Sequence, residues 1–204
     1  MRALLIVDMQ NDFMPNGPLG VKNADALIPL INALIPRFPL VVASQDWHPP
    51  DHVSFATSHP GKKPGDHVRV KEMDQVLWAV HCVRNTPGAE LVFGLNKEKI
   101  ACCFFKGTDS GIDSYSAFFD NARSKSTGLG DYLKSRGVTA VYLVGVATDY
   151  CVLYSSLDAI DLGFEVHVIA DACRPINLDP RDEERALAAI AARGGTIESI
   201  RPLA

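Results

Sequence analysis

Short apolar runs alternate along the chain with segments in which hydrophobic residues recur at helical spacing. The apolar runs, rich in β-branched residues, are typical of strands covered on both faces, and we expect strands at 3–7, 40–44, 100–105, 140–146, 165–170 and 196–200. Between them, hydrophobic residues three and four positions apart predict helices at about 27–35, 129–136, 151–160 and 182–191. This alternation predicts an α/β fold in one domain, 1–204, with a doubly wound parallel sheet of about six strands and helices on both faces.

The segment from about 46 to 99 is the one long stretch in which the pattern predicts no regular element. Prolines, glycines and lysines fill its middle, at 59–67. A connection of this length inside a compact domain is either functional or contains elements that the sequence does not reveal. We therefore expect an insertion with a role of its own.

Composition places the chain among globular proteins, because 47% of its residues are hydrophobic and 22% are charged. The net charge is −4 and no basic run stands out, which argues against nucleic acid as a partner. No apolar segment approaches the ~20 residues that cross a membrane, and Asp8 comes too early for a signal peptide. Five cysteines, an odd number, indicate free thiols in a reducing, cytoplasmic setting. Whether the chain is a monomer or a homo-oligomer stays open.

The stretch 140–152 carries a candidate nucleophile. Gly145 ends the apolar run, and Thr148 and Asp149 are residue types that cap helix N-termini. A sharp strand-to-helix turn would leave Cys151 in the first helical turn, where unpaired backbone N–H groups and the helix dipole favour a thiolate. The same N–H groups are suited to hold a developing oxyanion. The alternative is a buried, inert cysteine.

Two further polar residues follow predicted strands in the same way. Asp8 ends the first apolar run, and Lys106 follows the third. Because the carboxyl ends of parallel strands lie at one edge of a sheet, Asp8, Lys106 and Cys151 would converge there as base, electrostatic support and nucleophile. As alternatives, Asp8 would be a turn or cap residue, and Lys106 would extend its amine to solvent.

Histidines crowd into the insertion, at 48, 52, 59 and 67, and His81 is close behind. Asp46 and His48 lie two residues apart, on the same side of an extended backbone. With His81 they form a carboxylate-and-two-histidine set that can hold a divalent ion with open positions. His52 is a candidate fourth ligand or a hydrogen-bonding neighbour of one. The alternative for this cluster is hydrogen bonding within a loop.

Three short sequence signatures contain the candidate catalytic residues. Asp8 is followed by the sequence Gln-Asn-Asp-Phe at 10–13, Lys106 by Gly107, and Gly145 opens the sequence Gly-Val-Ala-Thr-Asp-Tyr-Cys-Val. Together they resemble the cysteine hydrolases of the isochorismatase-like superfamily. The sequences Ser-Gln-Asp-Trp-His-Pro at 44–49, Asp-His-x-Ser-Phe at 51–55 and Trp-x-x-His-Cys at 78–82 are similar to those of its nicotinamidase branch. The match covers essentially the whole chain and departs at Ala79, where the family often has proline.

The resemblance implies a catalytic triad of Asp8, Lys106 and Cys151. It also implies an oxyanion hole made by the backbone N–H groups of Ala147 and Cys151, with a cis peptide before Ala147. The reaction would be hydrolysis of nicotinamide to nicotinate and ammonia through a thioester at Cys151. Pyrazinamide would be a further substrate, and NAD salvage would be the setting.

The resemblance further implies how the substrate is held. Asp46, His48 and His81 would bind one divalent metal ion, zinc first with iron or manganese as alternatives, and the ion would take the pyridine nitrogen. His52 and Ser54 are candidates for a fourth ligand or for its neighbour.

The substrate pocket is implied in the same way. The pyridine ring would lie between Phe13 and Trp78, and Tyr115 would close the pocket.

Two other functions stay open. The chain would hydrolyse another small amide or ureido compound with the same triad, although the metal set is usually missing from those relatives. Alternatively, it would be a metal-binding or thiol redox-sensing protein, which would leave Asp8 and Lys106 without a use.

The remaining cysteines and histidines have structural expectations only. Cys102 and Cys103 should face opposite sides of a strand, Cys82 should support a neighbouring ligand, and Cys173 should lie in a loop. We expect His59 and His67 to be solvated and His167 to lie in the core or on a sheet face.

Overall fold

The computed structural model describes residues 1–200 of the chain. Its strands are β1 (Arg2–Val7), β2 (Leu40–Asp46), β3 (His67–Val70), β4 (Met73–Val76), β5 (Cys102–Lys106), β6 (Ala140–Val146), β7 (Glu165–Arg174) and β8 (Thr196–Glu198). Its α-helices are α1 (Leu27–Leu34), α2 (Leu129–Ser135), α3 (Leu153–Asp161) and α4 (Asp182–Ala192). Short 3₁₀ helices are Asn11–Phe13, Ile35–Arg37, Ala56–Ser58, Pro87–Ala89 and Lys97–Lys99, and a π-helical turn, Thr148–Val152, precedes α3.

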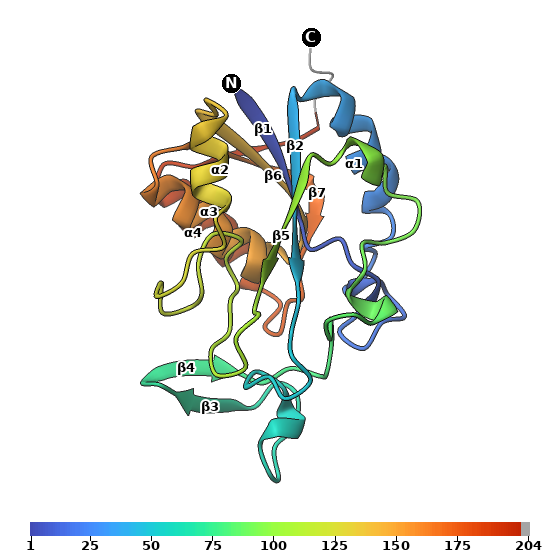
Figure 1. The fold of residues 1–204 in the computed structure, drawn as a ribbon, viewed down its shortest axis with the longest axis vertical. Coiled ribbons are helices and arrows are strands. Elements are labelled where there is room, and N and C mark those ends of the chain that lie inside the picture. The colour runs from blue at the N-terminus through green and yellow to red at the C-terminus, as the bar shows by residue number, and fades with distance from the viewer. Residues whose placement is uncertain (201–204) are drawn as a thin grey trace.

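Six strands form one parallel sheet in the order β5-β2-β1-β6-β7-β8, and β3 and β4 form a separate antiparallel ribbon. The first α-helix covers one face of the sheet and the other three cover the opposite face (Figure 1). The predicted α/β fold, a single-domain doubly wound sheet of six strands, is therefore confirmed. Among the described residues, no helix is both long and apolar enough to cross a membrane.

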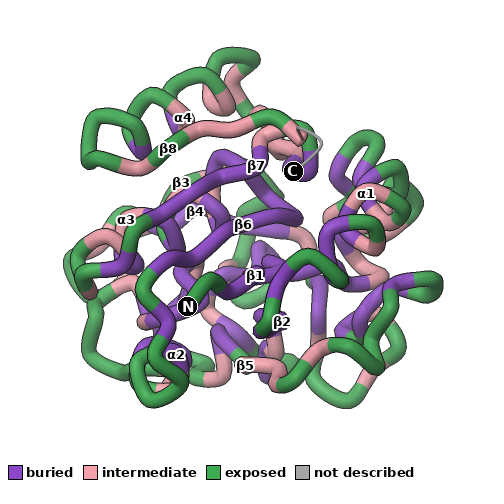
Figure 2. The backbone as a smooth tube through the Cα atoms, turned by 90° about the horizontal axis from the view of Figure 1, so that it is seen from above, coloured by how far each residue is buried: buried purple, intermediate pink, exposed green. Residues whose placement is uncertain are grey.

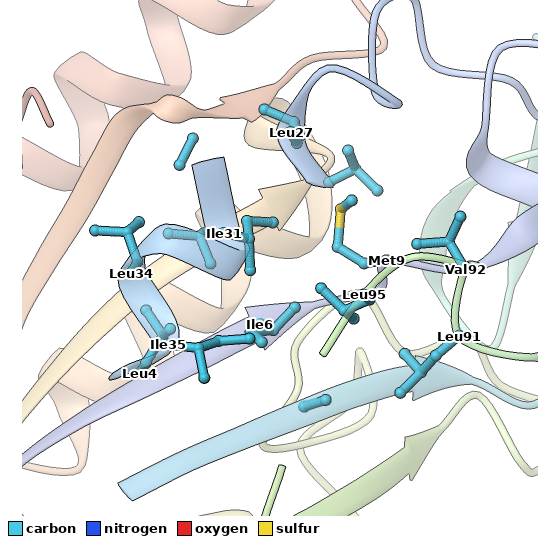
Figure 3. Close-up of a cluster of buried hydrophobic side chains, with 14 of the residues drawn as sticks. Leu4, Ile6, Met9, Leu27, Ile31, Leu34, Ile35, Leu91, Val92 and Leu95 are labelled. Atoms are coloured by element: carbon cyan, nitrogen blue, oxygen red, sulfur yellow. The ribbon is translucent and has the colours of Figure 1, made fainter. Parts of the chain in front are cut away.

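The central strand β1 is buried on both sides, which explains its continuous apolar run. Alternate side chains of a strand point to opposite faces, so each face of the sheet has its own core. One core packs α1 onto the sheet (Figure 3): Leu4, Ile6, Met9, Leu27, Ile31 and Leu34. The other lies under α2, α3 and α4: Ala3, Leu5, Val7, Leu129, Leu133, Ala159 and Ile190. Figure 2 shows the buried backbone concentrated along the central strands.

Strand β6 has the predicted bounds, 140–146, with Gly145 inside it. The φ of Gly145 is +115°, and a Cβ there would lie 2.1 Å from the carbonyl oxygen of Val7. Glycine therefore permits the close approach of β6 to β1. Strand β7 continues past Asp171 to Arg174 through an irregularity in its pairing with β6. Cys173, expected in a loop, is consequently a buried strand residue.

The 46–99 segment contains the β3–β4 ribbon, which the sequence does not predict. The ribbon lies beyond the carboxyl ends of the sheet strands (Figure 1). Its strands are short and largely exposed or half-buried, so they lack the apolar runs of the main sheet. Its turn carries Lys71 and Glu72 at φ +45° and +64°, where a glycine would be the usual signal of a hairpin.

Candidate active site

The carboxyl ends of adjacent strands bring the polar residues predicted from the sequence together. Asp8 follows β1, Asp46 and Lys106 are the last residues of β2 and β5, and Cys151 follows β6. Asp46 and Lys106 are direct partners in the register between β2 and β5. All four side chains are buried. One edge of the sheet thus places two carboxyl groups, an amine and a thiol in one cluster.

The Lys106 amine is the centre of this cluster. It donates hydrogen bonds to Asp46 Oδ1 at 2.6 Å, to the Ser114 carbonyl oxygen at 3.0 Å and to Cys151 Sγ at 3.3 Å. Asp8 Oδ2 lies 2.9 Å from the same nitrogen. An ammonium group has only three hydrogens, so this oxygen pairs with the charge but receives no hydrogen bond from the described residues. Burial opposes the charge, but Asp46 and Asp8 raise the pKa of Lys106 well above its usual range.

Asp8 is arranged as a proton acceptor. Its Oδ1 accepts a hydrogen bond of 2.7 Å from the Ser44 hydroxyl, whereas Oδ2, beside the Lys106 amine, accepts no hydrogen bond from the part of the chain that the structure describes. A carboxylate oxygen of Asp8 lies within 4.8 Å of Cys151 Sγ. Burial raises the pKa of Asp8, and the Asp46 charge adds to the rise against the opposing effects of Lys106 and Ser44. A raised pKa makes the carboxylate a stronger base.

The surroundings of Cys151 favour the thiol, whereas its place at a helix start favours the thiolate. Burial raises the pKa of the thiol well above its usual value. Lys106 acts in the opposite direction, and the negative charges of Asp8 and Asp46 add to the rise. Desolvation outweighs one nearby cation. Removal of the thiol proton therefore needs a base at hand.

The turn that carries Cys151 differs from the predicted helix start. A π-helical turn precedes α3, and neither Thr148 nor Asp149 caps it. Instead, the Asp149 carboxylate accepts hydrogen bonds from the N–H groups of Ile176 and Asn177 at 2.9 and 2.7 Å. These bonds tie the loop after β7 to the nucleophile turn.

Asp46, His48 and His81 place one ligand atom each within 4.8 Å of one another. The Nε2 atoms of His48 and His81 lie 3.6 and 3.7 Å from Asp46 Oδ2. Each Nδ1 instead faces a carbonyl oxygen, that of Gly107 at 2.9 Å and that of Ala79 at 2.8 Å. A carbonyl only accepts, so each ring carries a proton on Nδ1 and directs Nε2 at Asp46. The carboxylate oxygen of Asp46 and the two Nε2 atoms are suitable ligands for a divalent metal ion that keeps open coordination positions.

Asp46 connects these ligands to the reactive cluster. Its Oδ1 pairs with Lys106 and its Oδ2 faces the two histidines. Burial opposes ionisation, but Lys106 and His48 lower the pKa of Asp46 well below its usual range. The Gln10 side chain fixes the backbone here, since it accepts from Asp46 N–H and donates to the Asp46 carbonyl oxygen, both at 2.8 Å. Asp46 thus contacts both the reactive cluster and the two histidines through one carboxylate held in place.

His52 and Ser54, the candidates for a fourth ligand or its neighbour, contact each other. His52 Nδ1 lies 2.7 Å from Ser54 Oγ, and His52 Nε2 lies 3.3 Å from the Ile112 carbonyl oxygen. Both ring nitrogens are engaged, and burial beside His48 lowers the pKa of His52 to about 4. The His52 ring contacts the His48 ring at a centroid distance of 4.1 Å, so it supports a ligand by packing.

A narrow pocket, with a cavity volume of about 20 Å³, opens onto Cys151 and the three metal-ligand candidates. Phe13, Trp78 and Tyr115 line it, as does Ala147, whose preceding peptide bond is cis. The structure thus gathers the predicted nucleophile, ligands and pocket residues around one cavity. Asp8 and Lys106 lie beneath it. The lining combines aromatic side chains with a few polar groups beside the thiol, as in sites that bind small molecules.

The isochorismatase domain matches residues 2–201 of the chain. The chain belongs to the isochorismatase family. A nicotinamidase of Escherichia coli is 43% identical over 203 residues, 98% of this chain and 95% of that protein. The solved nicotinamidase/pyrazinamidase of Acinetobacter baumannii is 44% identical with a TM-score of 0.94, covering 97% of this chain and 95% of that one. The pyrazinamidase of Pyrococcus horikoshii, solved in complex with zinc, is 40% identical with a TM-score of 0.79, covering 98% and 99%.

As a member of the isochorismatase family, the chain is an enzyme that hydrolyses amide bonds. Its site includes pocket residues that sequence reasoning missed: Leu19, Asp113, Ser114, Tyr150 and Ile176. The role of Gln10 could have been found from the sequence, because Gln10 lies in the signature that follows Asp8. The role of Ser114 could not, because Ser114 holds Lys106 through a backbone carbonyl, which every residue type has.

Proposed function

We propose that this enzyme is a nicotinamidase, which hydrolyses nicotinamide to nicotinate and ammonia. The observation that carries the proposal is the single pocket shared by Cys151, the three ligand side chains and the aromatic residues Phe13 and Trp78. The pyridine ring lies between the two aromatic side chains, with its amide carbon over the Cys151 sulfur. The names of the relatives support the same substrate class, and pyrazinamide is the second substrate.

Asp46, His48 and His81 are the residues that hold one divalent metal ion in this proposal, and zinc is favoured over iron or manganese. When bound, the ion supplies a Lewis-acid partner for the pyridine nitrogen and so orients the ring. The donor set and its two carbonyl-fixed histidines support this assignment, as does the zinc named with the Pyrococcus horikoshii structure. His52 and Ser54 stay outside the ligand set, and the 46–99 insertion is the metal-binding part of the domain.

Asp8 begins the reaction by taking the thiol proton of Cys151 through its free Oδ2. The sulfur then bonds to the amide carbon, and the carbonyl electrons move onto the oxygen. Lys106 balances the charge of the thiolate from 3.3 Å. The backbone N–H groups of Ala147 and Cys151 donate to the oxyanion, each worth about 3 kcal/mol of barrier.

Asp8 also completes the cycle. It returns its proton to the amide nitrogen as the C–N bond breaks, and ammonia leaves a thioester on Cys151. Water then attacks the thioester carbon while Asp8 accepts its proton. The C–S bond breaks, the thiolate regains that proton, and nicotinic acid leaves and gives its own proton to solvent as nicotinate.

The proposed activity implies a setting. Formation of nicotinate would serve NAD salvage, and the five free cysteines favour the reducing cytoplasm as its location. Its proposed partner is a small molecule, and neither nucleic acid nor a membrane has a part.

A comparison of substrates tests the proposal. Metal-replete protein should release ammonia from nicotinamide and pyrazinamide. Benzamide, which lacks the ring nitrogen, should be a poor substrate. Equal rates with benzamide and nicotinamide would show that the ring nitrogen has no role in substrate binding. Preference for a small ureido compound would overturn the nicotinamidase assignment.

A further inference from the structure

One buried polar side chain of the β3–β4 ribbon contacts residues that line the pocket. Gln75, on β4, is 4% exposed, and the reaction steps above make no use of it. Its Nε2 donates to the Val76 carbonyl oxygen at 2.7 Å and to Asp113 Oδ2 at 2.9 Å, and it lies 3.2 Å from the Tyr115 hydroxyl. Two of these acceptors belong to the pocket lining, so the amide joins the ribbon to the pocket.

Asp113 extends this connection toward the catalytic lysine. Its Oδ1 accepts the Ser114 N–H at 2.8 Å, while Oδ2 is the acceptor for Gln75. The carbonyl oxygen of Ser114 in turn accepts from Lys106. Lys106 keeps Asp8 and Asp46 as charged partners whatever happens to this carbonyl. A shift of the segment should therefore disturb the lysine less than the pocket wall.

Tyr115 is the second pocket residue that contacts Gln75. Its hydroxyl lies 3.2 Å from Gln75 Nε2. Its ring packs on Tyr150 and Tyr154, each at a centroid distance of 5.3 Å. Its backbone N–H is held by Asn121. The contact with Gln75 therefore helps to fix where the hydroxyl end of the ring lies.

We propose that Gln75 is a positioning residue for the substrate, holding Tyr115 across the pocket next to Trp78. This inference rests on the proposed nicotinamidase function. Gln75 touches no reacting atom, so its effect should fall on substrate binding rather than on the chemical step. A purely structural role would instead change stability and lower kcat without a selective effect on KM.

The test compares Gln75→Met, Tyr115→Phe and the double variant. Methionine keeps the length of glutamine but has no N–H group. We expect Gln75→Met to raise KM for nicotinamide about tenfold, the scale of one hydrogen bond to a charged partner, with kcat changed less than about threefold. Tyr115→Phe should also raise KM. The double variant should be no worse than the more affected single one, because the two changes break the same contact.

Two controls sharpen this test. Asp74→Ala removes the exposed pair between His67 and Asp74 on the same ribbon and should leave KM unchanged. The rate at which iodoacetamide alkylates Cys151 reports on the reactive cluster without needing a substrate, and Gln75→Met should keep it within about twofold.

Several results would overturn the inference. They are a wild-type KM in Gln75→Met, a fall in kcat with KM unchanged, or additive effects in the double variant. If Gln75→Met does not fold, Tyr115→Phe tests the same contact alone, and a wild-type KM there counts against the inference. Wild-type protein that leaves nicotinamide intact would instead overturn the proposed function.

Discussion

The reactive half of the site and its ring-binding half are built in different ways. The reactive half consists of Asp8, Lys106 and Cys151, which lie at or just beyond the ends of sheet strands. Backbone hydrogen bonds between neighbouring strands hold these strand ends in place. His81 and Trp78 come from the 46–99 segment outside the sheet, where side chains hold the backbone. The sheet thus positions the groups proposed for the chemistry, and the insertion positions two of those proposed to bind the substrate.

One loop contact shows what replaces the ladder in the ring-binding half. The Cys82 N–H, next to His81, donates to Asp12 Oδ2 at 2.7 Å. Cys82 has a φ of +45°, an unfavourable conformation for a residue with a Cβ. A Cβ on Gly88 would lie 2.3 Å from the Asp12 carboxylate, so the position needs glycine. The placement of His81 thus depends on a carboxylate far from it in sequence, Asp12, and on a glycine that makes room for that carboxylate.

Asp46 is where the two halves meet, with one oxygen for Lys106 and the other for the histidines. Variants that touch only one half should therefore separate chemistry from binding. Variants at Asp46 should affect both.

The largest effect is expected from Cys151→Ala in the reactive half. Loss of the nucleophile should lower kcat about 10⁴-fold or more, while metal content stays that of the wild type because Asp46, His48 and His81 are intact. Steady-state rates and metal analysis check both statements. Cys102→Ala, at a half-buried cysteine of β5, is the control and should keep activity. Turnover near the wild-type rate in Cys151→Ala would rule out the thioester route.

Lys106→Met should come next. It leaves Asp8 and Asp46 buried without their shared cation, which should cost about 3–5 kcal/mol of unfolding free energy, together with most of the activity. Urea denaturation measures the first effect. Lys125→Met, at an exposed lysine, should change stability by less than about 0.5 kcal/mol. Equal stabilities for the two variants would contradict the central position given to Lys106.

Of the variants Cys151→Ala, Lys106→Met and His81→Ala, the last should affect the reactive half least. Loss of a ligand should weaken nicotinate binding about 100-fold or more, yet leave the alkylation rate of Cys151 close to that of the wild type. Asp46→Ala should change both properties, because Lys106 also loses a partner. Titration with nicotinate and timed alkylation compare the pair. If His81→Ala altered alkylation as much as Asp46→Ala, the two halves would not be separable.

Sequence reasoning succeeded where local pattern and topology carry the information. The apolar runs predicted the six strands, and their ends predicted that Asp8, Lys106 and Cys151 would meet. It failed where a backbone conformation decides the outcome. Nothing in the sequence indicated the close approach between β6 and β1 at Gly145, and Asp149 was taken as a cap but binds the loop after β7.

The ring-binding half was predictable only in part. The spacing of Asp46, His48 and His81 suggested a ligand set, but Phe13, Trp78 and Tyr115 entered only through the family resemblance. Gln75 and Asp113 gave no signal, because their partners are distant in sequence and lie on an unpredicted ribbon and a loop. Contacts of this kind depend on tertiary placement rather than on a local repeat.

The measurement that tests the central claim most directly is turnover of nicotinamide in the presence of hydroxylamine. A thioester on Cys151 can be captured by this competing nucleophile. The account predicts nicotinohydroxamate formed at the expense of nicotinate, with ammonia release undiminished and no hydroxamate from Cys151→Ala. Nicotinate as the sole product at all hydroxylamine concentrations would contradict a covalent intermediate and, with it, the division of labour described for Asp8, Lys106 and Cys151.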